Sequence, residues 1–170
     1  MSKFEELCKS YKTSRENFLS NKDDSYSFAA TLVENYIRYL QIPRECLKFL
    51  PLNKQIKPNT TYTLFGSIHF DEDGFWHLGV QITIRTVQED IPEQEVLICF
   101  MFKKIGPDRF LVKLYSKDSG HLIDIGNYQD YTVFFDFLQQ EITALFDETR
   151  HEFTETVSPL KTLGVNPQYE

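Results

Sequence analysis

Residues 62–85 read YTLFGSIHFDEDGFWHLGVQITIR, and this stretch predicts the central hairpin of the fold. Apolar and polar side chains alternate on both sides of the acidic turn DEDG, which is the period of a β-strand with one buried face. The two apolar sets share one face only if Phe70 lies opposite Trp76. That register also places His69 opposite His77 on the other face. The pattern therefore predicts a hairpin together with its register.

The spacing of apolar residues predicts two helices before this hairpin and one after it. A capping box at Ser2 begins the first helix, which we expect over residues 3–20. A polar turn at residues 21–25 separates it from a second helix, whose apolar stripe runs through residues 28–40. The last helix is expected over residues 128–148, where large apolar residues again recur at helical spacing. All three helices have an apolar face that can cover a sheet.

Alternation resumes after the first hairpin and predicts a second one. Residues 95–103 and 109–116 are its strands, and residues 121–125 add a short fifth strand. The element order predicts an α+β fold, in which two N-terminal helices and a long C-terminal helix pack on one face of an antiparallel meander of four or five strands. We expect one domain over residues 1–150, followed by an irregular tail over residues 151–170.

Charge and hydropathy exclude several classes of partner. The chain of 170 residues has a formal net charge of −7 and no cluster of Lys and Arg, so we expect no nucleic-acid partner. No apolar run approaches the roughly 18 residues of a membrane helix. The N-terminus is acidic and amphipathic and lacks the pattern of a signal peptide. We therefore expect no membrane partner and a cytoplasmic location.

The three cysteines indicate a reducing environment. Cys8, Cys46 and Cys99 are odd in number and widely spaced, and each stands among apolar residues at regular spacing. This arrangement is typical of reduced thiols in a core, not of a disulfide framework.

The face of the sheet that points away from the helices is predicted to be partly apolar. If alternate residues of the second hairpin form the core, their neighbours must point outward. Monomers rarely leave such a strip exposed, so we expect a cover, which is the tail, a second copy of the chain or a ligand. The candidate binding residues on this face are Leu97, Met101, Leu111, Tyr115, Phe65, Gln81 and Arg85.

His69, His77 and Asp71 form the candidate metal site of the sequence. Two imidazoles and a carboxylate on adjacent strands are able to hold a divalent cation with open positions. The alternatives are a solvated cross-strand pair and a pH-responsive pair, because two opposed imidazoles disfavour double protonation. The sequence contains no phosphate-binding glycine loop and no nucleophile elbow. We therefore expect neither catalytic residues nor a cofactor.

These observations favour a non-enzymatic binding or adaptor module. Its outer sheet face would engage a protein partner or a second copy of the chain, forming a homodimer. The alternative is a small-molecule-binding or enzymatic domain with a pocket between a curved sheet and the helices. An enclosed cavity with convergent polar groups would favour this alternative.

Overall fold

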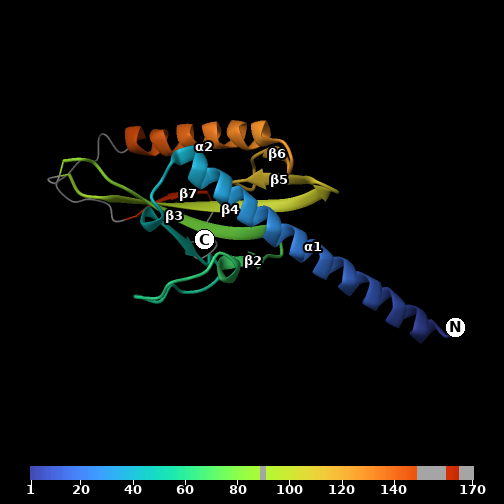
Figure 1. The fold of residues 1–170 in the computed structure, drawn as a ribbon. Helices are drawn as coiled ribbons and strands as arrows, with labels where there is room; N and C mark the ends of the chain where they lie inside the picture. The colour runs from blue at the N-terminus through green and yellow to red at the C-terminus, as the bar shows by residue number, and fades with distance from the viewer. Residues whose placement is uncertain (89–90, 149–159, 165–170) are drawn as a thin grey trace.

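The computed structural model describes residues 1–88, 91–148 and 160–164. In these residues two long helices cover one face of a single sheet, which is the predicted α+β arrangement (Figure 1). The helices are α1 (Lys3–Leu40) and α2 (Tyr128–Glu148), with short 3-10 helices η1 (Arg44–Cys46) and η2 (Phe65–Ser67). The strands are β1 (Leu47–Leu50), β2 (Ile68–Phe70), β3 (Trp76–Ile84), β4 (Gln94–Gly106), β5 (Arg109–Lys113), β6 (His121–Asp124) and β7 (Leu160–Leu163). No helix in the described ranges combines the length and the apolar character needed to cross a membrane.

The sheet is built on two long antiparallel strands, β3 and β4. Two shorter strands, β1 and β2, pair one after the other with the outer edge of β3. In the same way β7 and β5 pair with the outer edge of β4, and β6 extends the sheet beyond β5. Strand β7 runs parallel to β4, whereas the other pairings are antiparallel. Strands β3 and β4 are therefore paired on both of their edges wherever a short strand lies beside them.

The predicted register of the first hairpin is confirmed. Phe70 pairs with Trp76 and His69 pairs with His77. The Trp76 side chain is buried under α1 in the aromatic core. Gly74 closes the turn with a φ of 80°, in the left-handed region that glycine adopts without a Cβ clash. The alternation of apolar residues was thus sufficient to fix which side chains share a face.

Helix α1 is one continuous helix, so the predicted break at residues 21–25 is wrong. Each Asn, Asp or Ser in a helix interior costs about 0.5 kcal/mol relative to alanine, and no Gly or Pro interrupts this stretch. The folded protein supplies partners that offset the cost, because Asp24 forms an ion pair with Lys104 of β4 at 2.5 Å. Ser25, fully buried, lies 3.4 Å from the side-chain oxygen of Asn21 one turn earlier.

The first strand is shorter than predicted, because η2 occupies part of its expected length. Thr63 holds this turn through local hydrogen bonds. Its hydroxyl accepts from the Gly66 amide at 3.0 Å, and its carbonyl accepts from the Ser67 hydroxyl at 2.8 Å. Such bonds compete with the strand ladder. Strand β1, which the sequence did not predict, takes the vacated edge of β3.

The tail contains a strand where irregular structure was predicted. Strand β7 pairs with the first half of β4, from Glu95 opposite Leu160 to Ile98 opposite Leu163. Leu163 is buried in the core between sheet and helices. The expectation of an irregular tail is therefore wrong for these four residues, and residues 151–159 and 165–170 lie outside the described part of the chain.

Aromatic rings fill the core between the sheet and the helices. Phe28 of α1 stacks on Phe110 of β5 with ring centroids 4.0 Å apart. Tyr36, further along α1, contacts Phe135 of α2 at 5.0 Å. Aromatic pairs of this kind contribute about 0.5–1.5 kcal/mol beyond the burial of their area. The C-terminal half of α1 is thereby attached to both the sheet and α2.

We predict that Gly79→Ala destabilises the fold. Gly79 faces outward from β3, and a Cβ atom there would overlap the Leu50 carbonyl oxygen and lie 2.8 Å from the Leu52 side chain. Overpacking of this kind costs about 1–3 kcal/mol in the free energy of unfolding, measurable by urea denaturation. The matched control is Gly106→Ala, whose Cβ would meet only Arg109 at an ordinary 3.6 Å. Equal effects of the two substitutions would contradict the prediction.

Candidate functional site

The structure buries the centre of the apolar strip that the sequence placed on the outer sheet face. Leu97 is 3% exposed and Met101 is 1% exposed, while Leu111 and Tyr115 are partly buried. These exposures are those of a single chain. Leu97 and Met101 are therefore covered without a second copy, and they offer no surface to a partner.

Two segments of the chain pack over this strip. Leu52, just after β1, and Leu160 of β7 form a small apolar cluster with Leu97 and Cys99. Burial raises the pKa of the Cys99 thiol to about 12. A thiol that stays protonated is a poor nucleophile, so Cys99 acts as a packing residue.

The other candidate binding residues of the outer face do not come together. Phe65 points to the helix side and stacks on Tyr26 of α1 with centroids 5.5 Å apart, so its predicted outward position is wrong. The turn η2 interrupts the alternation on which that prediction depended. Gln81 is buried within the outer face, and Arg85 lies past the end of β3 in an ion pair with Glu93 at 2.7 Å.

The two histidines of the hairpin stack on each other. The ring centroids of His69 and His77 are 5.1 Å apart and the rings are 19° from parallel. His77 Nε2 lies 2.8 Å from a carboxylate oxygen of Asp73, whereas His69 Nε2 is 4.0 Å from Asp71. Within the described ranges no group of three or more His, Cys, Asp and Glu side chains is arranged to hold a metal ion. The geometry is that of a packed imidazole pair with one carboxylate partner.

Burial makes His69 costly to protonate. Both ring nitrogens of His69 and Nδ1 of His77 are buried and have no hydrogen-bond partner. Desolvation lowers the pKa of His69, the neighbouring His77 lowers it further, and Asp71 and Asp73 act in the opposite direction. The neutral imidazole is therefore the favoured form of His69 in the folded protein.

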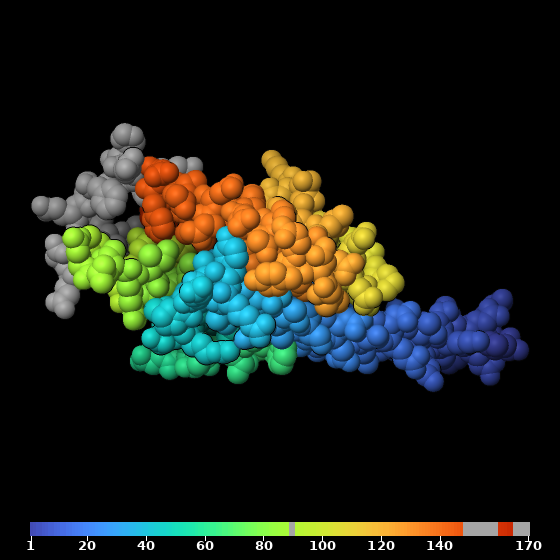
Figure 2. Space-filling model, turned by 45° about the horizontal axis from the view of Figure 1, so that its top comes forward, coloured from blue at the N-terminus to red at the C-terminus, as the bar shows by residue number. Residues whose placement is uncertain are grey.

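The largest unpartnered feature of the described chain is the N-terminal half of α1. Every residue from Met1 to Asn17 is exposed, and this part of the helix extends beyond the sheet (Figures 1 and 2). We call residues 3–17 the arm. At about 1.5 Å per residue the arm is about 22 Å long. It is helical without tertiary support, because the capping box of Ser2 and Glu5 closes its first turn and its other end continues into the packed helix.

The arm carries apolar side chains that continue the buried face of α1. Phe4, Tyr11, Phe18, Ser25 and Leu32 follow one another at intervals of seven residues, which places them on one side of the helix. Leu32 and Ser25 are fully buried, and Phe18 is partly buried at the edge of the sheet. Phe4 and Tyr11 are 74% and 72% exposed. The face that packs on the sheet in the body is thus solvent-exposed in the arm.

Leu7 adds to this face, with 68% of its surface exposed. We define the stripe as Phe4, Leu7 and Tyr11. At its base the stripe meets an aromatic rim, where Phe18 contacts both Phe70 and Trp76 at about 6 Å between centroids. Phe70 on this rim is itself about half exposed. The stripe and Phe70 of the rim are exposed large apolar side chains, the type of residue that marks protein–protein contacts when such residues are contiguous.

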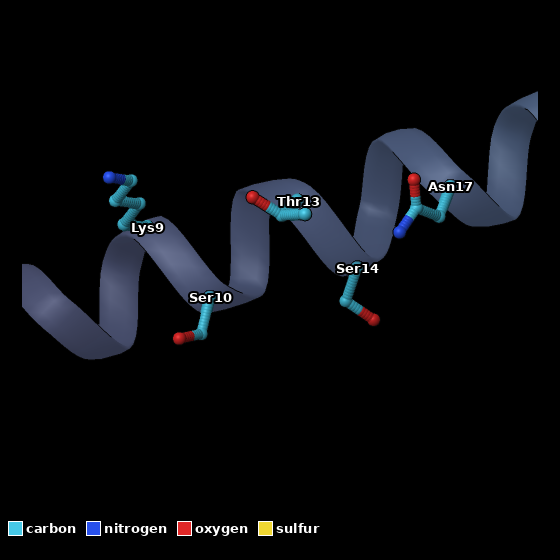
Figure 3. A pocket seen from close by; sticks show the side chains of 5 residues that line it. All are labelled: Lys9, Ser10, Thr13, Ser14 and Asn17. Carbon is cyan, nitrogen blue, oxygen red and sulfur yellow. The ribbon is translucent and has the colours of Figure 1, made fainter.

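Polar side chains line a shallow hollow on the side of the arm that faces away from the stripe. The hollow lies on α1 alone and is lined by Lys9, Ser10, Thr13, Ser14 and Asn17 (Figure 3). A hollow on one exposed helix is surface relief and not a ligand pocket. Of these residues Ser14 lies nearest to the stripe, and its short side chain lets a second helix approach there.

The sequence could not distinguish the arm from a core helix. The periodic spacing of apolar residues in a helix is the same whether the surface that covers them belongs to the same chain or to another molecule. Cys8 shows the consequence, because the expectation of three core thiols is correct for Cys46 and Cys99 but wrong for Cys8, which is exposed on the arm. The signal available was the length of α1 relative to the sheet, and it required knowing that residues 21–25 do not break the helix.

No protein-family model matches the chain, and comparisons with curated proteins and with solved structures gave no match. Neither the sheet nor the arm can therefore be assigned a role by analogy.

We predict that His69→Asn makes stability less dependent on pH. The folded protein binds a proton at His69 less readily than the unfolded chain, whose imidazole has the ordinary pKa near 6.5. The contribution of neutral His69 is thus fully present above that value and is lost as the pH falls through the lowered pKa of the folded state. Urea denaturation of wild type at about pH 7.5 and about pH 5 should show a loss of stability that His69→Asn reduces.

His121 provides the comparison for this measurement, because burial also lowers its pKa. His121→Asn should remove a separate part of the pH dependence, and the double variant should flatten it further. If His69→Asn keeps the full wild-type difference between the two pH values, the account of the histidine pair is wrong.

We predict that Met101→Glu destabilises the single chain. An unpaired carboxylate at this buried position costs roughly 3–5 kcal/mol in the free energy of unfolding. Leu122→Glu is the matched control, since Leu122 lies on the neighbouring part of the sheet and is 54% exposed. Its cost should stay within about 0.5 kcal/mol. Equal stability of the two variants in urea denaturation would show that Met101 is not covered by its own chain.

Proposed function

We propose that this protein is a non-enzymatic protein-binding module and that the stripe of the arm is its binding surface. The observation that carries this proposal is the exposure of Phe4, Leu7 and Tyr11, by 74%, 68% and 72%, on a helix whose same face is buried further along. An amphipathic helix that presents its apolar face is a recurrent mode of protein recognition.

The arm is suited to binding because it is already helical. An isolated helix of about 15 residues is marginal in water, since nucleation is costly. Here the packed half of α1 supplies the nucleus, and the Ser2 hydroxyl accepts from the Glu5 amide at 3.1 Å to cap the free end. A partner therefore does not have to meet the full entropy cost of folding this segment.

Several features support a binding role over a catalytic one. The space between sheet and helices, where the alternative function requires a pocket, is occupied in the described chain by stacked rings such as Phe28 on Phe110. His77, which is buried on the outer face of the sheet, is paired with Asp73. Burial raises the pKa of the Cys99 thiol, which disfavours the reactive thiolate. These groups have the properties of packed structural residues.

The charge and the cysteines support two narrower parts of the proposal. A net charge of −7 disfavours nucleic acid as the partner and favours a protein. Cys46 and Cys99 are buried and unpaired, as is usual in a reducing compartment, so we propose the cytoplasm as the location.

Site-specific photo-crosslinking tests the binding surface. We predict that the full chain with p-benzoylphenylalanine in place of Tyr11, irradiated in the cells that produce it, forms a discrete covalent adduct with a protein. The matched control carries the same group at Thr13, which lies on the opposite side of the arm and is also exposed. An adduct at position 11 but not at position 13 supports the proposal. No adduct at either position, or equal adducts at both, would count against it.

A further inference from the structure

We infer that the partner of the arm is a second copy of this chain, and that two arms pair antiparallel along their stripes. This inference rests on the proposed function and adds the identity of the partner. Three observations carry it, which are the sizes of the side chains along the stripe, the charges beside it and the position of the arm on the body.

The stripe, extended by Ser14, is complementary in side-chain size to the same residues of a second copy when the two helices run antiparallel. Phe4, Leu7, Tyr11 and Ser14 follow at steps of three and four residues, which is the seam of a helix pair. When two arms cross head to tail with Leu7 opposite Tyr11, Phe4 lies opposite Ser14 of the second copy. An aromatic ring then meets the smallest side chain of the four. A parallel pair would instead set Phe4 against Phe4 and Ser14 against Ser14, which leaves a gap at one end.

The charges beside the seam favour the same direction. Arg15 stands near the base of the arm directly beside the stripe. Glu5 stands near the tip, further around the same side, where one of its carboxylate oxygens accepts from the Ser2 amide at 2.6 Å and the other is able to accept from a second partner. Arg15 lies over the Phe18 ring, with its guanidinium carbon 5.3 Å from the centroid, so it is held beside the stripe. Head-to-tail pairing brings Glu5 of each arm toward Arg15 of the other and makes two symmetric ion pairs. Exposed pairs of this type contribute little energy but select orientation.

The placement of the arm permits this arrangement. The arm extends past the sheet and points away from the body (Figures 1 and 2). Head-to-tail pairing of two arms of about 22 Å therefore puts the bodies at opposite ends, where they do not collide. The exposed tip, with Met1 81% exposed, then reaches toward the aromatic rim around Phe70 of the second copy.

The expected dimer is weak and reversible. Each arm contributes two aromatic side chains and one leucine, and an aromatic side chain buries about 150–250 Å². The pair thus falls at or below the low end of the roughly 1,200–2,000 Å² buried in stable complexes. We expect dissociation constants in the micromolar range, so the measurement must span concentration.

Analytical ultracentrifugation of the purified full chain, from about 5 to about 500 µM, is the first experiment. Wild type should pass from monomer to dimer. Tyr11→Glu should stay monomeric over this range because it places a carboxylate in the seam, while Thr13→Glu, on the far side of the arm, should match wild type. Circular dichroism of each variant checks that the helix remains. A monomeric wild type, or a dimer that survives Tyr11→Glu, would overturn the inference.

A charge exchange tests the direction of pairing. Glu5→Lys alone brings two cations together, because the introduced lysine faces Arg15 of the second copy. It also removes the carboxylate of the capping box, so the comparison requires that circular dichroism shows the same helix content as wild type. Arg15→Glu alone brings two carboxylates together in the same way, so each variant should dimerise about tenfold more weakly than wild type. Mixed in equal amounts, the two variants restore both ion pairs and should form a heterodimer of near wild-type affinity. A mixture no tighter than its components would exclude the antiparallel pair.

The failure of this inference can be told apart from the failure of the proposed function. A chain that stays monomeric but gives a photo-adduct of a different protein at position 11 retains the binding function and loses the second copy as partner. A monomeric chain without any adduct loses both. A photo-adduct of twice the mass of the chain, together with the charge-exchange result, supports both.

Discussion

The pairing of β3 with β4 is the interaction on which the rest of the structure depends. Nine consecutive residue pairs join the two strands, from Trp76 opposite Phe102 to Ile84 opposite Gln94. This ladder sets one row of apolar side chains toward the helices and another toward the opposite face. Because the two strands are long, each has an outer edge that accommodates two short strands. The helices then pack on the face that this pairing creates.

The central ladder is covered on one face and in part on the other, so we expect a partner to bind elsewhere. The helices cover one face, and Leu52 and Leu160 cover part of the other. On α1 the apolar side chains of Phe4, Leu7 and Tyr11 remain accessible. Helix α1 has 38 residues and is about 57 Å long, whereas β4, the longest described strand, has 13 residues and spans about 44 Å. Helix α1 is thus longer than any described strand, and its N-terminal part, the arm, extends past the sheet (Figure 1).

The sequence predicted those features that depend on periodicity within one element. The register at Trp76, the second hairpin and the bounds of α2 follow from alternation or helical spacing, and the structure has them. The features that the sequence did not predict depend on contacts with other parts of the chain or on local hydrogen bonds. Asp24 remains in a helix because Lys104, 80 residues away, pairs with it, and Phe65 turns toward α1 because Thr63 bonds locally. The packed histidine rings were placed correctly by register, but their burial depended on segments that periodicity does not position.

Strand β7 imposes an order on the assembly of the sheet. Its parallel pairing at Val96, Leu97 and Ile98 joins residues more than 60 positions apart. Until residues 160–163 emerge from the ribosome, this part of β4 is an unprotected strand edge with consecutive large apolar side chains. Such edges pair readily with other chains and promote aggregation. During synthesis the nascent protein therefore has an unpaired strand edge that promotes aggregation. In the folded molecule β7, which is synthesised well after β3 and β4, pairs with this edge and covers it.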